Sequence, residues 1–281
     1  MTPHQSPRPP GTISPDDGVA LGRQIRGSGD DVVFVHGTSA DATRWAPVID
    51  HLGSHRRCTS YDRRGRGRSG DDQCYELGRE VADLLSVIRH ANADGPTHVV
   101  AHSYGALVAL AAGAAAPDRF ESLVLYEAPV AFPDASFIDP ARVAELERVL
   151  ASEGGDAAVT FFQREFPRST PHDIAAMRLS PMWQARVASA HTIARELRAA
   201  LAFDPVTGGQ VPVSIPILLI VGSDSVAPFA TSAARLQRLM PHARRIDLPG
   251  QRHRAIDAIP QRFAAILKEF QDDVRARAAD Q

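Results

Sequence analysis

The feature that most constrains the fold is a serine placed between a predicted strand and a predicted helix. Ser103 follows the apolar run at 97–100 and precedes an alanine-rich segment at 106–116. A strand that turns sharply into a helix presents the side chain at the turn clear of the backbone. The residues two before and two after the serine, Ala101 and Gly105, are small, as such a turn requires. The pattern favours a nucleophilic hydroxyl, with an ordinary helix N-cap as the alternative.

Two other predicted strands lead to residues that suit a catalytic base and its orienting acid. The apolar run at 215–221 leads to Asp224, and a shorter strand at 244–248 leads to a loop that carries His253. Asp224 is the predicted acid and His253 the predicted base, because an imidazole needs a carboxylate to hold its tautomer. Glu127, which ends another predicted strand, is the alternative acid.

Five segments, taken in order, carry a family resemblance. The strand at 32–35 leads into the first of them. The segments are His36-Gly37-Thr38, Asp62 with Gly65-x-Gly67-x-Ser69, the serine turn, Gly222-Ser223-Asp224 and His253. Together they resemble the α/β-hydrolase fold family, in particular its capped, esterase-like members with a serine nucleophile. The resemblance extends over roughly residues 15–275. That family orders its triad as serine, acid, histidine, unlike chymotrypsin or subtilisin.

The resemblance implies an α/β architecture, a mostly parallel central sheet flanked by helices. It implies an oxyanion hole made by the backbone N–H groups of Thr38 and Tyr104. The implied activity is hydrolysis of an ester, thioester or related carbonyl bond of a small to medium hydrophobic molecule, through an acyl-enzyme. Members of the family also include C–C bond hydrolases, lyases, cyclases, cofactor-free oxygenases and ligand receptors with slow turnover, and these stay open as alternatives.

The histidine loop departs from the family pattern. Relatives commonly read Gly-x-Gly-His, whereas this chain reads Gly250-Gln251-Arg252-His253-Arg254. Two interpretations stay open. Either the positive charges of Arg252 and Arg254 disfavour the protonated imidazole of His253, or both arginine side chains point into solvent.

The segment at 130–210 loses the strand pattern and takes up helical periodicity, which predicts a helical cap inserted into a core made of 13–129 and 211–278. Core helices are expected near 41–53, 75–92, 104–117, 229–240 and 256–278. Candidate pocket residues are Trp45 from the core and Phe132, Phe137, Phe161, Met177, Met182 and Trp183 from the cap. Ordinary cap-to-core packing explains each of the cap residues at least as well, and the alternative for Trp45 is that it seats its own helix.

Composition limits the partners. The 281 residues carry a formal net charge of −2, which argues against a nucleic-acid surface or an anionic membrane surface, so a small-molecule substrate is expected. Residues 1–12 are polar and proline-rich, and they are predicted to form a flexible tail rather than a signal peptide. Two cysteines without ligand spacing predict no metal site and a cytoplasmic location. No cofactor is implied, and the sequence leaves the oligomeric state open.

A glycine-rich segment at 65–70 matches the dinucleotide fingerprint G-x-G-x-x-G. Two aspartates follow it where a phosphate-binding helix should begin, so a dinucleotide site is rejected. The four arginines in and beside this segment are expected to form a solvated or partly paired face: Arg63, Arg64, Arg66 and Arg68.

Overall fold

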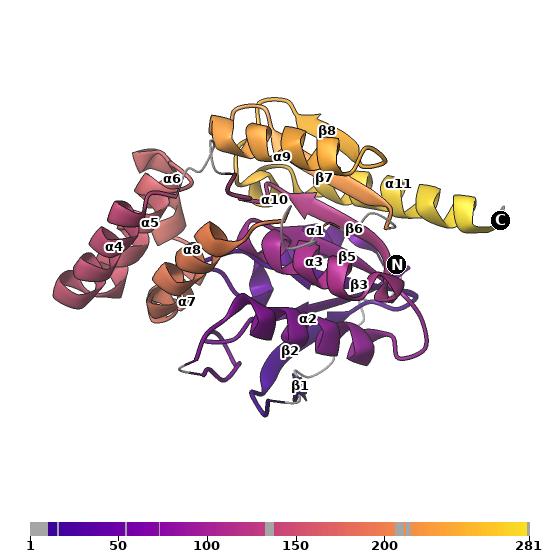
Figure 1. The fold of residues 1–281 in the computed structure, drawn as a ribbon, viewed down its shortest axis with the longest axis horizontal. Coiled ribbons are helices and arrows are strands. Elements are labelled where there is room, and N and C mark those ends of the chain that lie inside the picture. Colours follow the sequence, from indigo (N-terminus) through magenta and orange to yellow (C-terminus); the bar gives the residue numbers. More distant parts are fainter. Residues whose placement is uncertain are drawn as a thin grey trace.

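An eight-stranded sheet forms the centre of the molecule (Figure 1). The computed structural model describes residues 11–15, 17–53, 55–72, 74–132, 138–205, 211 and 215–279. The strand order is β1-β2-β4-β3-β5-β6-β7-β8. In chain order the strands are β1 (Gly11–Ile13), β2 (Leu21–Arg26), β3 (Asp30–Val35), β4 (Arg56–Tyr61), β5 (Thr97–His102), β6 (Phe120–Tyr126), β7 (Ile217–Gly222) and β8 (Arg244–Leu248).

The pairing from β4 to β8 is parallel throughout, which confirms the predicted mostly parallel sheet. The strands β1 and β2 add an antiparallel edge that the sequence analysis did not identify. The prediction of a flexible tail over residues 1–12 is wrong for its last two residues, because β1 begins at Gly11. Residues 1–10 lie outside the described residues.

Helices cover both faces of the sheet. In chain order they are η1 (Ala42–Trp45), α1 (Ala46–Leu52), α2 (Leu77–Ala91), α3 (Tyr104–Ala115), η2 (Pro117–Arg119), α4 (Pro140–Glu153), α5 (Gly155–Glu165), α6 (Pro171–Arg178), α7 (Met182–Ala188), η3 (Ala190–Thr192), α8 (Ile193–Ala202), α9 (Ala227–Leu239), α10 (Ala255–Ala258) and α11 (Pro260–Ala279). The core helices fall where the sequence predicted them, within a few residues at each end.

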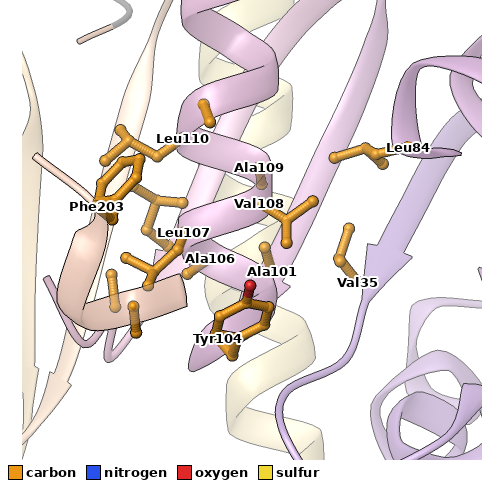
Figure 2. Close-up of a cluster of buried hydrophobic side chains, with 14 of the residues drawn as sticks. Val35, Leu84, Ala101, Tyr104, Ala106, Leu107, Val108, Ala109, Leu110 and Phe203 are labelled. Carbon is orange, nitrogen blue, oxygen red and sulfur yellow. The ribbon is translucent and has the colours of Figure 1, made fainter. Parts of the chain in front are cut away.

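Alternation along β3 shows how the two layers form. Val33 and Val35 pack with α2 and α3, whereas Val32 and Phe34 pack with α1 and α11 on the opposite face. Because both faces are covered, the central parallel strands are apolar almost throughout. The alanine-rich helix α3 is buried along most of its length, and Figure 2 shows its buried side chains from Tyr104 to Leu110. Small side chains let a helix pack closely on a sheet.

The helices α4 to α8 lie between β6 and β7 in the chain and stand at one end of the core (Figure 1). They pack mainly on one another, and α8 also contacts α3. This helical insertion occupies the segment for which helices were predicted, although residues 133–137 and 206–210 lie outside the described residues. No helix in the described part of the chain is long and apolar enough to cross a membrane.

Candidate active site

Ser103 occupies a strained turn between β5 and α3. Its φ is 53°, in a region that residues with a Cβ rarely adopt. Small neighbours make the turn possible, because a Cβ on Gly105 would lie 2.4 Å from the carbonyl oxygen of His36. A Cβ on Gly37 would lie 2.8 Å from the Cβ of Ser103. The turn and the loop after β3 are therefore in direct contact.

Replacing Gly105 with alanine should lower the free energy of unfolding by about 1–3 kcal/mol, because the added methyl must push two backbone segments apart. Gly78→Ala on α2 is the matched control, since a Cβ there would meet no neighbouring segment within 4 Å, and alanine at this position should be neutral or stabilising. Urea unfolding measures both. Equal stability of the two variants would contradict the close contact at the turn.

Glu127, rather than Asp224, contacts the predicted base. The Nδ1 of His253 is hydrogen-bonded to Oε2 of Glu127. Oε1 of Glu127 accepts hydrogen bonds from the backbone N–H of Gly222, at 2.8 Å, and from the hydroxyl of Ser225. The carboxylate is 1% exposed and follows directly after β6. Both carboxylate oxygens of Glu127 are thus hydrogen-bonded.

The prediction that Asp224 pairs with His253 is wrong. Asp224 lies close to the histidine loop, and its backbone N–H donates to the carbonyl of Gln251 at 2.9 Å. Its carboxylate, however, is exposed and accepts a hydrogen bond from the hydroxyl of Ser223 at 2.8 Å. The turn after β7 directs the backbone of Asp224 inward and its side chain outward.

Aromatic rings fix the imidazole in place. The ring of Phe229 stacks on His253 with centroids 4.6 Å apart, and the ring of His102 lies 4.4 Å away. Burial, together with the nearby His253, lowers the pKa of His102 well below its ordinary value, so His102 is a neutral supporting ring. The hydroxyl of Tyr126 donates to the carbonyl of Arg252 and accepts from the N–H of Ala255, which anchors the histidine loop.

The loop after β3 is held by a buried neutral histidine. His36 donates from Nδ1 to the carbonyl of Gly37 at 2.9 Å and accepts at Nε2 from the backbone N–H of Arg63 at 3.1 Å. Burial and the charge of Arg63 lower the pKa of His36 well below its ordinary value, in agreement with this neutral form. Thr38, the next residue in the loop, lines the same cavity as Ser103.

One cavity brings these residues together. Its empty volume is about 750 Å³ with the open solvent at its mouth included, and Thr38, Ser103, Tyr104 and His253 all line it. The helical insertion provides the opposite wall. The larger apolar lining side chains are Ile138, Phe162, Phe166, Met177, Leu197 and Phe229.

The sequence pattern described as the alpha/beta hydrolase family matches residues 32–266. A solved alpha/beta hydrolase from Sphaerobacter thermophilus is 32% identical, with a TM-score of 0.80 and coverage of 92% of this chain and 99% of that one. The chain belongs to the α/β-hydrolase family. The fold and family predicted from the sequence are confirmed, and the protein is an enzyme of the hydrolase class.

Two curated relatives of this α/β hydrolase have names that state an activity. One is the (E)-2-((N-methylformamido)methylene)succinate hydrolase of Acinetobacter baylyi, 25% identical over 87% of this chain and 91% of the relative. The other is the 2-(acetamidomethylene)succinate hydrolase of Mesorhizobium japonicum, 25% identical over 90% and 92%. A solved enol-lactonase from Burkholderia xenovorans shares the fold at 20% identity, with a TM-score of 0.77 and coverage of 92% and 99%.

Of the predicted pocket residues, Met177 lines the cavity of this α/β hydrolase. The ring of Trp45 instead packs between Phe34 and Phe263 beneath the sheet. Four other described candidates are not part of the cavity lining: Phe132, Phe161, Met182 and Trp183. Phe137 lies outside the described residues. Phe162 and Phe166 were missed, although their spacing of four placed both on one helical face.

The segment at 62–70 forms a turn around the side chain of Asp62. Asp62 accepts from the backbone N–H groups of Ala42, at 2.8 Å, and Arg68, at 3.0 Å. A Cβ on Gly67 would lie 2.4 Å from the carboxyl carbon of Asp62. The expectation of a solvated or partly paired arginine face is wrong for three of the four arginines, which are buried in ion pairs: Arg63, Arg64 and Arg66.

Three further arginines lie in the cavity wall, and the sequence analysis placed only one of them, Arg254 beside His253, near the site. Arg44, Arg186 and Arg254 line the same cavity as Ser103. They come from η1, α7 and the histidine loop, which are distant in sequence. For Arg44 and Arg186, only the tertiary fold brings the charge to the site.

Proposed function

We propose that this α/β hydrolase cleaves an ester, thioester or related carbonyl bond of a small molecule, with Ser103 as nucleophile, His253 as base and Glu127 as orienting acid. The observation that carries the proposal is the hydrogen bond from His253 to the buried carboxylate of Glu127, beside a serine on a strained turn in the same cavity. This constellation has the three roles of a serine-hydrolase triad.

The proposed reaction follows from which imidazole nitrogen of His253 is hydrogen-bonded to Glu127. Glu127 accepts the proton-bearing Nδ1, so Nε2 of His253 is free to accept the proton of Ser103 as its Oγ attacks the substrate carbonyl carbon. The tetrahedral intermediate then expels the alcohol, thiol or amine, which takes that proton from His253. Water attacks the acyl-enzyme, gives one proton to His253, and the acid leaves as Ser103 recovers its proton.

The developing oxyanion requires donors beside Ser103. The backbone N–H groups of Thr38 and Tyr104 fill this role in the proposal, since both residues line the cavity next to the nucleophile. Each such donor contributes about 3 kcal/mol of transition-state stabilisation in enzymes of this type. Tyr104 is the first residue of α3, where backbone N–H groups have no acceptor inside the helix.

The cavity lining and the similar proteins together indicate the class of substrate. Apolar side chains from the helical insertion, which we propose acts as a cap, suit a hydrophobic substrate portion. The two curated relatives are named as hydrolases of substituted succinates, which supports a compact substrate with a hydrolysable acyl group.

Reaction with an alkyl fluorophosphonate tests the proposal. The probe should add once to the wild-type protein, at Ser103, as measured by intact mass and peptide mapping. Ser103→Ala should remove the adduct, whereas Ser223→Ala, at an exposed serine near the site, should keep it. Folded wild-type protein that forms no adduct would contradict an activated serine and favour a receptor with slow turnover.

A further inference from the structure

The cavity wall contains a buried arginine without a carboxylate partner. Arg186 on α7 is 8% exposed and lines the cavity with Ser103. Its Nη1 donates to the carbonyl oxygen and, at 3.1 Å, to the hydroxyl of Ser39. Within the part of the chain that the structure describes, no carboxylate lies within ion-pair distance of Arg186.

The other buried arginines in the described residues differ in this respect. Each has at least one carboxylate partner: Arg44 with Asp257, Arg56 with Asp30 and Asp272, Arg63 with Glu196, Arg64 with Asp83 and Arg66 with Glu196. A buried charge is costly unless it is paired. The fold therefore supplies a partner wherever a buried arginine is structural, and leaves Arg186 without one.

Neighbouring charges increase the need for an anion at this place. Arg44 and Arg254 also line the cavity, and both pair with the same carboxylate, that of Asp257. Asp257 and Asp41 are close enough to Arg186 to offset part of this positive charge, although neither forms an ion pair with it. Burial and the charge of Arg44 lower the pKa of Arg186 to about 10, so the guanidinium is still charged at neutral pH but is destabilised.

The position of Arg186 relative to the reacting serine is set by Ser39. Ser39 directly follows Thr38, the residue proposed to donate to the oxyanion, and it has a φ of 54°. The bonds from Arg186 use Nη1, which leaves the Nε and Nη2 edge for a ligand. A guanidinium edge with two parallel N–H donors matches the two oxygens of a carboxylate.

We propose that Arg186 binds a carboxylate group of the substrate, so that this enzyme acts on acidic acyl compounds whose carboxylate lies at the α7 side of the cavity while the scissile carbonyl lies at Ser103. The inference rests on the proposed function, because it assigns the substrate of that same site. Arg186 is then a substrate-binding residue, and the charges of Arg44 and Arg254 favour the same anion.

Two matched substrates test the inference. The monoester 4-nitrophenyl hydrogen glutarate carries a carboxylate, and 4-nitrophenyl 5-methylhexanoate replaces it with an isopropyl group of similar shape. We expect the wild-type enzyme to favour the acidic ester about ten- to hundred-fold in kcat/KM, after subtraction of its spontaneous hydrolysis, as a charged hydrogen-bonded contact provides. A wild-type preference for the neutral ester would overturn the inference without any variant.

Variants then assign the preference to one residue. Arg186→Met should remove the preference, because KM for the acidic ester rises and its kcat/KM falls by a larger factor than that of the neutral ester. Arg186→Lys should keep part of the preference and guards against a folding defect in the methionine variant. Arg164→Met, at an exposed arginine on α5, should behave as wild type. A preference unchanged in both Arg186 variants would overturn the assignment.

The same assays separate the two proposals. A wild-type enzyme that the fluorophosphonate does not label, or that turns over neither ester, would refute the proposed triad. Labelling and turnover that persist without discrimination between the esters would refute only the carboxylate site.

Discussion

Glu127→Gln should lower kcat/KM for a 4-nitrophenyl ester by on the order of 10³- to 10⁴-fold, while Asp224→Asn should keep most of the activity. A glutamine has nearly the shape of glutamate, and its carbonyl can still accept from the N–H of Gly222. Its amide group then faces Nδ1 of His253 as a donor. This arrangement favours the tautomer with the proton on Nε2, which cannot accept the proton of Ser103.

The comparison of the two variants is the informative measurement. Initial rates with a 4-nitrophenyl ester and second-order rate constants for fluorophosphonate labelling of Ser103 should fall together in Glu127→Gln. Thermal unfolding should show that the variant is folded, since the substitution preserves the side-chain volume. Asp224→Asn is the matched control, because its carboxylate is exposed and bonds only locally. The assignment fails if Asp224→Asn is the inactive variant and Glu127→Gln is active.

The choice of acid shows where reasoning from the sequence stops. Glu127 follows directly after β6 and Asp224 lies two residues after β7, so the pattern of apolar runs placed both at the correct edge of the sheet. The sequence does not tell which side chain turns inward. That depends on φ at Glu127, which is 49°, and on donors such as Ser225 that are distant in the chain from Glu127. The strand ends were predictable; the side-chain direction was not.

The rest of the fold and site divides in the same way. Long periodic elements such as α2, α3 and α11 were predictable because burial of one face or of the whole element leaves a pattern. The short edge strands β1 and β2 carry little such pattern. In the cavity, local periodicity locates apolar faces but not charges. The guanidinium of Arg186 reaches the site only because α7 packs beside the loop that carries Ser39.

The buried charge cluster between α8 and the loop after β4 joins the helical insertion to the core. Arg63 and Arg66 both donate to Oε1 of Glu196, and all three residues are almost fully buried. Arg63 also lies 3.4 Å from Oε2 of Glu80 and 4.9 Å from the ring centre of Tyr104. Glu196 is thus the carboxylate that both arginines share. Arg63 in turn contacts Tyr104, the residue that follows the nucleophile.

Glu196→Gln should therefore lower the free energy of unfolding by about 3–5 kcal/mol at neutral pH, because it removes the shared charge and leaves two buried guanidiniums undercompensated. Glu147→Gln is the matched control. Glu147 also pairs with an arginine of α8, Arg198, but at the surface, so its loss should cost less than about 1 kcal/mol. Urea unfolding at constant m-value measures both variants.

The pH dependence of that difference identifies its electrostatic origin. Burial acts to raise the pKa of Glu196, but the charges of Arg63 and Arg66 outweigh it, so its pKa is lowered in the folded protein. A carboxylate with a lowered folded-state pKa stabilises the fold at pH values above its unfolded pKa, about 4.3, and loses this effect as pH falls through the folded value. The gap in stability between wild type and Glu196→Gln should therefore be constant from about pH 6 to 8 and shrink progressively below about pH 4. A gap that stays the same in acid would mean that altered packing, rather than the lost charge, destabilises the variant.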